Sequence, residues 1–243
     1  MMMNPILNPK QPKAVVVVDD GDVAIKLRYV GAQASATVTV SSDGDLTFKH
    51  GVAGAEVVDS TVGASGVMDV STSSYNTFAK VLDNLNGSAN WEAYLVDALR
   101  ADSSIDTLAT LSEATISPNT ELSLSKDTSV ALELAIRIGK RSNVTGSEAK
   151  SAAEIYSITS VNTFASGTSL IKIYEVNEDA KTETLIYSLA GGATTVEDTK
   201  TFVSNGRGSL GVSKVGNYLV VKMVGSAACT GSLQAVGAVG LGS

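Results

Sequence analysis

Residues 132–138 read Leu-Glu-Leu-Ala-Ile-Arg-Ile, the most regular two-residue alternation in this 243-residue chain. Apolar side chains occupy every even-numbered position of the run, whereas the charged side chains of Glu133 and Arg137 occupy odd-numbered ones. Successive side chains of a β-strand point to opposite faces of the sheet, so this pattern predicts a half-buried strand. Similar runs recur along most of the sequence and indicate a mainly β fold.

The neighbouring runs are short and are separated by Gly, Asn and Asp residues, which favour turns. Before residue 132, strands are expected at 14–18, 23–30, 36–40, 46–50, 67–70 and from 121 onward, with a polar connection over 103–118. After it, strands are expected at 155–161, 170–176, 184–189, 196–203, 210–215, 218–224 and 233–236. Short strands at such even spacing predict an antiparallel β-sandwich, jelly-roll-like in its arrangement.

One short amphipathic helix is expected at about 75–86, inserted in the N-terminal β domain. Its apolar positions recur at helical spacing and form one stripe: Phe78, Val81, Leu82 and Leu85. We expect Ser73 or Ser74 to cap the first turn and Gly87 to end the helix. Residues 91–100 fit either a helix or a strand, and we favour a strand.

Composition divides the chain into three parts. Residues 1–13 contain three of the four prolines and are expected to form an extended N-terminal arm. Residues 14–140 are expected to form an N-terminal β-rich domain with the inserted helix. The polar, Gly-containing segment after residue 138 marks the boundary. Residues 148–243 are then expected to form a C-terminal β-sandwich domain with a Gly/Ala-rich tail.

The chain is poor in the side chains that carry most catalysis near neutral pH, because it has one His (His50) and one Cys (Cys229). A single Cys excludes an intrachain disulfide, and no Cys/His cluster offers zinc ligands. We therefore expect a protein that is not an enzyme and has no catalytic residue, cofactor or metal. A carboxylate-based hydrolase is a minor alternative, which requires two acidic side chains facing each other across a cleft.

The charge balance bears on the class of partner. The formal net charge is −7 and the Lys and Arg residues are dispersed, whereas nucleic-acid binding needs a basic face. No run approaches the roughly 18 apolar residues of a membrane span. We therefore expect neither nucleic acid nor membrane as a partner.

Three local motifs are better explained by structure than by function. Asp19, Asp20 and Asp22 resemble a cation site, but the further ligands of a calcium loop do not follow, so a solvated turn is favoured. Residues 206–211 match the spaced glycines of a dinucleotide site without the following helix, so they are interpreted as a turn. His50 ends an expected strand and is interpreted as a strand-end histidine rather than a proton switch.

Residues 61–70, 75–86 and 91–100 carry a resemblance to a known class of proteins. They place an Asn-Thr-Phe helix start at 76–78 inside a β domain rich in Ser, Thr, Ala and Val. In this the chain resembles structural proteins of tailed bacteriophage virions. The resemblance implies an accessory virion component, above all a capsid decoration or cement protein that stabilises the shell through contacts between subunits. The long spine helix of a major capsid protein is absent from the sequence pattern.

The resemblance also implies the partners and the location. We expect a homo-oligomer that contacts other virion proteins, either the major capsid protein or a tail protein, in a virion assembled in the host cytoplasm. Extended arms and tails can add strands to neighbouring subunits. Assembly contacts are therefore expected from Pro5, Ile6, Leu7, Pro9, Pro12, Leu233, Val236, Val239 and Leu241.

The alternative is a tail or fibre subunit that binds glycans of the host surface. Such a function requires an exposed aromatic patch, because flat amphipathic rings stack on sugars. The aromatic residues considered for it are Trp91, Tyr94, Tyr174, Tyr187 and Tyr218. For Trp91 and Tyr94, packing in the core beside the helix is the favoured interpretation.

Overall fold

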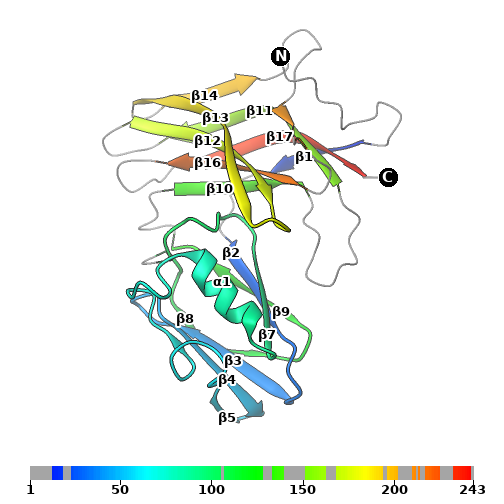
Figure 1. Ribbon diagram of the computed structural model, residues 1–243. Helices are drawn as coiled ribbons and strands as arrows, with labels where there is room; N and C mark the ends of the chain where they lie inside the picture. Colours follow the sequence, from blue (N-terminus) through cyan, green and yellow to red (C-terminus); the bar gives the residue numbers. More distant parts are fainter. Residues whose placement is uncertain are drawn as a thin grey trace. The chain divides into compact units, whose positions relative to one another are not determined.

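The computed structural model describes residues 13–18, 23–104, 107–127, 133–139, 151–162, 168–193, 196–201, 210–211, 213, 217–224 and 232–241. The protein is mainly β, with antiparallel sheets and, in the described ranges, one α-helix (Figure 1). The chain divides into two compact units. Residues 22–130 form the first, here called the helix unit. Residues 131–243 together with residues 1–21 form the second, here called the strand unit.

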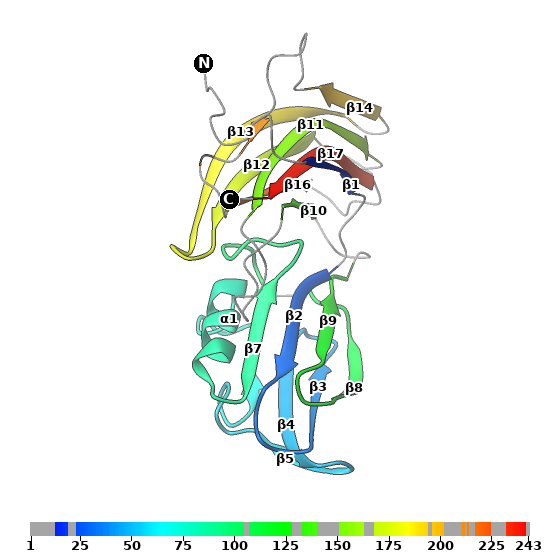
Figure 2. The same ribbon diagram turned by 90° about the vertical axis from the view of Figure 1, so that its right-hand side faces the viewer.

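The helix unit contains two antiparallel sheets. The first has the order β7-β2-β9, with β7 at Trp91–Leu95, β2 at Val23–Tyr29 and β9 at Glu121–Ser125. The second has the order β5-β4-β3-β8, with β5 at Ala55–Val58, β4 at Leu46–Val52, β3 at Ser35–Val40 and β8 at Leu111–Ile116; β6 at Val67–Met68 also pairs with β4. The helix α1 spans Phe78–Gly87 and lies beside β7 (Figure 2).

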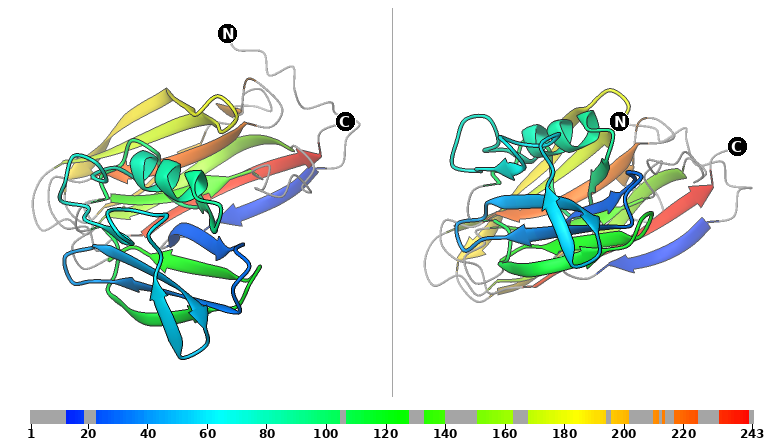
Figure 3. Two further views of the ribbon diagram at one scale, coloured as in Figure 1. Left: turned by 60° about the horizontal axis from the view of Figure 1, so that its bottom comes forward. Right: turned by 90° about the horizontal axis from the view of Figure 1, so that it is seen from below.

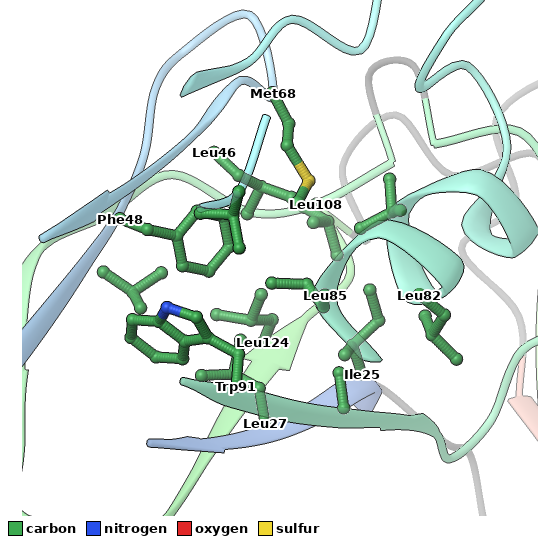
Figure 4. Close-up of a cluster of buried hydrophobic side chains, with 14 of the residues drawn as sticks. Ile25, Leu27, Leu46, Phe48, Met68, Leu82, Leu85, Trp91, Leu108 and Leu124 are labelled. Carbon is green, nitrogen blue, oxygen red and sulfur yellow. The ribbon is translucent and has the colours of Figure 1, made fainter. Parts of the chain in front are cut away.

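Alternation along the strands produces the core of the helix unit. Ile25, Leu27 and Tyr29 of β2 are fully buried, whereas the intervening Lys26 and Arg28 are half-buried. All four residues of the helical stripe predicted from the sequence are buried as well. Figure 4 shows Leu82 and Leu85 of α1 in the same cluster as Phe48 and Trp91, so one core joins both sheets and the helix.

The first turn of α1 is satisfied by backbone rather than by a side-chain cap. The N-cap residue is Thr77, whose side chain makes no capping hydrogen bond, so the predicted cap at Ser73 or Ser74 is wrong. Instead, the N–H groups of Phe78 and Ala79 donate to the carbonyl oxygens of residues 102 and 100, at 3.1 and 2.8 Å. The chain after β7 thus supplies acceptors that helices usually take from a cap. The predicted end at residue 87 is confirmed.

In its described residues, the strand unit also contains two antiparallel sheets. The first has the order β1-β17-β11-β14, with β1 at Lys13–Val18, β17 at Ser232–Leu241, β11 at Ser151–Asn162 and β14 at Val196–Thr201; β15 at Leu210–Gly211 also pairs with β11. Figure 3 shows β1 (blue), β17 (red) and β11 (green) side by side. The second has the order β10-β16-β12-β13, with β10 at Glu133–Ile138, β16 at Tyr218–Val224, β12 at Thr168–Asn177 and β13 at Thr182–Ala193.

The two sheets of the strand unit share one buried cluster. Its apolar side chains come from β10, β12 and β16 of one sheet and from β11 and β17 of the other. The alternating run that predicted a strand at 132–138 contributes Ile136 and Ile138, which are 0% and 1% exposed. The strand prediction for this run is therefore confirmed, with the strand beginning at Glu133.

Strand pairing differs from the expected division into domains at two strands. Residues 14–140 were expected to form one domain, but β1 pairs with β17 and β10 pairs with β16. Both strands therefore belong to the strand unit. The physical reason is that alternation shows only that a segment is a strand, while its partner is chosen by side-chain fit between distant segments.

Two strands of the helix unit were not expected from the sequence. β5 at Ala55–Val58 has only four residues, and β8 at Leu111–Ile116 lies in the segment interpreted as a polar connection. Both have mostly exposed or half-buried side chains, so neither shows a clear apolar face. The strand favoured for residues 91–100 is confirmed over Trp91–Leu95.

Candidate functional site

The β4–β5 hairpin presents the main exposed apolar side chains of the helix unit. Val52, Val57 and Val58 are 68%, 65% and 47% exposed. Among the described residues of this unit, these are the exposed large apolar side chains. The two residues between the strands, Ala53 and Gly54, form a tight turn in which Gly54 has φ +80°. That value suits the third position of a type II turn, which favours glycine. The hairpin lies at one end of its unit (Figures 1 and 2).

Glu56 fixes the shape of this hairpin. Its carboxylate accepts hydrogen bonds from Ser35 Oγ at 2.6 Å and from the N–H of Gly54 at 3.1 and 3.2 Å. Ser35, Gly51 and Glu56 lie opposite one another on β3, β4 and β5. The side chain therefore reaches from β5 across β4 to β3 at the position of Gly51, which has φ +153°. A Cβ on Gly51 would lie 3.3 Å from the Cα of Glu56. The Ser35 hydrogen bond is the main cause that lowers the pKa of the Glu56 carboxyl.

Asp59 follows β5 and anchors the hairpin to the other sheet. Its side chain is 0% exposed. One carboxylate oxygen, Oδ1, accepts from the N–H and Oγ1 of Thr61 at 2.9 and 2.6 Å. The other, Oδ2, accepts from Trp91 Nε1 at 2.8 Å and Asn90 Nδ2 at 3.0 Å. Four donors thus satisfy one buried charge and tie the end of β5 to the start of β7.

These hydrogen bonds decide the protonation of Asp59. Burial on its own raises the pKa of this carboxyl, because a charge is costly away from water. The hydrogen bonds from Thr61, Trp91 and Asn90 outweigh burial and leave the pKa below its usual value. Asp59 therefore stays ionised at neutral pH and stabilises the fold as an anion.

His50 lies next to this anion but is positioned by a different partner. Its Nδ1 is 3.1 Å from the hydroxyl of Tyr29 and 3.9 Å from Asp59 Oδ2. The N–H of Gln33 donates to the same hydroxyl at 3.2 Å, so the single hydroxyl hydrogen of Tyr29 is available to His50. The predicted strand-end position of His50 is wrong, because β4 continues to Val52 and pairs with β3 and β5 on either side of His50. The side chain is half-buried, with a partner that the sequence did not indicate.

An aromatic group packs beneath the polar cluster. Trp91 makes edge-to-face contacts with Tyr29 and Phe48, with ring centroids 5.3 and 5.0 Å apart. The Trp91 ring is 1% exposed, and its N–H is used by Asp59. The interpretation of Trp91 as a core residue is confirmed. The apolar hairpin therefore rests on a base in which ring packing and a satisfied anion fix the geometry.

The other aromatic residues considered for glycan binding are dispersed. Tyr218 is 2% exposed and belongs to β16, whereas Tyr174 and Tyr187 are half-buried on β12 and β13. Tyr94 is half-buried on β7 and donates to Glu121 Oε1 at 2.7 Å. With Trp91 also buried, two of the five residues are removed from any exposed aromatic surface.

The residues nominated for assembly contacts at the C-terminus lie in β17, between β1 and β11. Leu233 is 0% exposed and packs in the core, and Val236 is half-buried. Val239 pairs with residues 14 and 153, and Leu241 with residue 151. This strand thus uses both backbone edges within its own chain, where a free edge strand had been considered. The nominated arm residues Pro5, Ile6, Leu7, Pro9 and Pro12 lie outside the described residues, as do Asp19, Asp20, Asp22 and Cys229.

The strand unit buries two carboxylates that hold local structure. Glu175 Oε1 accepts from the N–H and Oγ of Ser213, both at 2.7 Å, and from Asn217 Nδ2 at 2.6 Å. Glu154 accepts from the hydroxyl of Tyr156 at 2.6 Å. Burial, the hydrogen bond to Glu154 and its charge raise the pKa of Tyr156 to about 12.

Within the described ranges, no group of three or more His, Cys, Asp or Glu side chains could hold a metal ion. In that part of the chain, no helix is long and apolar enough to cross a membrane. No protein-family model, curated protein or solved structure matches the chain.

Proposed function

We propose that the chain is a virion structural protein, a capsid decoration or cement protein that stabilises a shell through contacts between subunits. The observation that carries this proposal is the β4–β5 hairpin, which holds Val52, Val57 and Val58 in solvent on a fixed base. Exposed apolar side chains cost stability in an isolated protein, and together they mark interaction surfaces. The class of particle comes from the resemblance of residues 61–100 to tailed-phage proteins.

The proposal includes a β-sandwich architecture for both units. Two observations support it. In the strand unit, one buried cluster takes side chains from both antiparallel sheets. In the helix unit, one cluster does the same and adds the helix to it. Paired sheets with a thin shared core present broad outer faces, which suits a subunit that contacts neighbours on several sides.

The proposed partners are the major capsid protein or a tail protein, together with further copies of this chain, in a virion assembled in the host cytoplasm. Charge supports protein partners over nucleic acid. Residues 22–130 contain 14 acidic and six basic residues, which gives the helix unit a formal net charge of −8. An acidic unit of this kind is repelled by phosphate backbones.

The glycan-binding alternative is less well supported. It requires several exposed rings in one patch, but Trp91 and Tyr218 are buried. Tyr94 is engaged with Glu121 on the outer face of β7. Nothing in the arrangement of Tyr174 and Tyr187 adds a specific argument for sugar stacking.

The experiment is to compare the solution mass of the 243-residue chain with that of a chain lacking residues 1–12. This deletion removes the proline-rich arm and leaves β1, which begins at Lys13, intact. The proposal predicts an assembly larger than the 24.9 kDa monomer that weakens or falls apart on truncation. A chain that is monomeric with and without the arm, at every concentration tested by sedimentation velocity, would contradict it.

A further inference from the structure

We propose that His50 is a pH-responsive switch, which accepts a hydrogen bond from Tyr29 when it is neutral and donates one to Asp59 when it is protonated. His50 lies on β4 and Tyr29 on β2, so the two side chains come from different sheets of the helix unit. Asp59 follows β5 in the chain. The switch is a regulatory property of the fold and is independent of the proposed virion role.

The contacts of Tyr29 determine the state of His50 when the ring is neutral. Tyr29 is 0% exposed, so its hydroxyl hydrogen needs an acceptor inside the protein. In the described residues, the polar contacts of this hydroxyl are the N–H of Gln33 at 3.2 Å and His50 Nδ1 at 3.1 Å. The N–H of Gln33 is a donor, so Nδ1 is the acceptor. A neutral imidazole that accepts at Nδ1 carries its own hydrogen on Nε2, and we expect this tautomer.

Protonation of His50 reverses this contact. The ring then carries a hydrogen on Nδ1 as well, so Nδ1 can no longer accept the hydrogen of the Tyr29 hydroxyl. Asp59 Oδ2 lies 3.9 Å from Nδ1, which is already within the range of an ion pair. A short movement of the ring would make a charge-assisted hydrogen bond, which is stronger than a bond between neutral groups. The proton therefore transfers the link that His50 makes from Tyr29 to Asp59.

The anion that receives the protonated ring is already in place. The titratable groups that face His50 are Tyr29 from β2 and Asp59, and the residues paired with His50 on β3 and β5 are an alanine and a valine. Lys49 and Glu56 alternate with these positions along β4 and β5, so they lie on the opposite face of the sheet. The hydrogen bonds to Asp59 hold its pKa below the usual value. Asp59 is therefore ionised throughout the range of about pH 5 to 8, in which histidine ordinarily changes charge.

Trp91 is a built-in reporter of the switch. The His50 side chain is 23% exposed and can exchange protons with solvent, whereas the side chain of Asp59 is 0% exposed. Trp91 Nε1 donates to Asp59 Oδ2, the same oxygen that the protonated His50 would approach. A new donor on this oxygen changes the hydrogen bond of the indole. The single histidine and the single tryptophan of the chain are thus coupled through one carboxylate oxygen.

The test follows His50 and Trp91 by nuclear magnetic resonance in the isotope-labelled full chain, from about pH 8 down to about pH 5. Because the chain has one His and one Trp, the ring nitrogens and the indole N–H are assigned without ambiguity. At the upper pH, the hydrogen of the neutral ring is expected on Nε2. On acidification, the indole N–H signal is expected to shift with the same midpoint as the His50 nitrogens.

Two variants separate the two partners of His50. H50Q keeps a polar side chain that takes up no proton in this range, so the response of Trp91 to pH should be lost. Y29F removes the hydroxyl and keeps Asp59, so the Trp91 response should remain while the preference for the Nε2 tautomer weakens. Trp91 fluorescence at the upper pH verifies that each variant is folded. The inference is overturned by a neutral wild-type ring with its hydrogen on Nδ1, by an indole signal that does not follow the His50 midpoint, or by a Trp91 response that survives in H50Q or is lost in Y29F.

Discussion

Replacing Asp59 with Asn tests whether a single buried anion fixes the base of the hairpin. The carboxylate is 0% exposed and accepts four hydrogen bonds, two on each oxygen. Asn keeps one acceptor oxygen, but its NH₂ group is a donor. In one orientation that group faces the N–H groups of Trp91 and Asn90, and in the other it faces the backbone N–H and the hydroxyl of Thr61. In either orientation, donors lose their acceptor in a buried site.

The size of the effect follows from those contacts. A hydrogen bond to a charged group contributes about 1.5–3 kcal/mol, and a buried donor left unpaired costs about 1–3 kcal/mol. Loss of two such bonds, with partial relaxation of Thr61, gives an expected destabilisation of about 3–5 kcal/mol. This is a large part of the about 5–15 kcal/mol that stabilises an ordinary domain.

Trp91 makes the measurement specific. It is the single tryptophan of the chain and is buried in the helix unit, so its fluorescence during urea unfolding reports on that unit alone. The matched control is D43N, because Asp43 is an exposed aspartate in the turn before β4 and should change stability by less than about 0.5 kcal/mol. If D59N and D43N unfold at the same urea concentration, the buried anion does not have the role assigned to it.

Three further predictions follow from individual contacts. The pKa of Asp59 is lowered in the folded state. The ionised carboxylate therefore stabilises the fold fully above about pH 4, and this stabilisation is lost as the pH falls through the lower folded pKa. The difference in free energy of unfolding between wild type and D59N should narrow below about pH 4. N86A should lower the free energy of unfolding, followed by Trp91 fluorescence, by about 1–2 kcal/mol. The Asn86 side chain bonds both the N–H and the carbonyl oxygen of Ala93, at 2.8 and 2.9 Å. G237A should destabilise the strand unit by about 1–3 kcal/mol in circular dichroism, because a Cβ there would lie 2.4 Å from the carbonyl oxygen of Glu154.

For each of these three predictions, a specific result would contradict the physical reason given. A gap between wild type and D59N that stays constant from pH 7 to pH 3 would contradict the lowered pKa. An N86A protein as stable as wild type would mean that water replaces both bonds to residue 93 at no cost. For G237A the control is G87A, because a Cβ on Gly87 meets nothing within 4 Å, and equal effects of the two would refute the steric argument.

Local patterns in the sequence predicted most strands and the helix. The stripe of Phe78, Val81, Leu82 and Leu85 is buried as expected, and the alternation at 132–138 forms β10. Such patterns work because they depend only on which face of one element meets a core. They failed for β8, an edge strand in which three of the six side chains are polar and each face mixes polar with apolar residues, so there is no apolar face to detect.

The partners of the elements could not be predicted in the same way. The start of α1 is satisfied by carbonyl groups of residues 100 and 102, which no pattern near Ser73 or Ser74 could indicate. β1 pairs with β17, which lies more than 200 residues further along the chain. β1 therefore belongs to the strand unit and not to the expected N-terminal domain. Pairing of this range depends on packing across the whole unit.

The partners within the candidate site could not be predicted from the sequence either. The base of the hairpin depends on Asp59, which in the sequence stands between two valines and a serine and has no distinguishing neighbours. Only the fold brings Trp91 and Asn90 within hydrogen-bond distance of it. The glycine at 51 is a signal that was available, since an isolated glycine inside a strand indicates close approach of another group. In the structure that group is the backbone of β5, because a Cβ on Gly51 would lie 3.3 Å from the Cα of Glu56.

The central claim is that this protein functions by associating with other subunits, and the molar mass of the full chain in solution tests it most directly. Light scattering over a wide range of concentration should give values that rise from 24.9 kDa toward a defined multiple as the concentration increases. A mass that stays at 24.9 kDa throughout would contradict the claim.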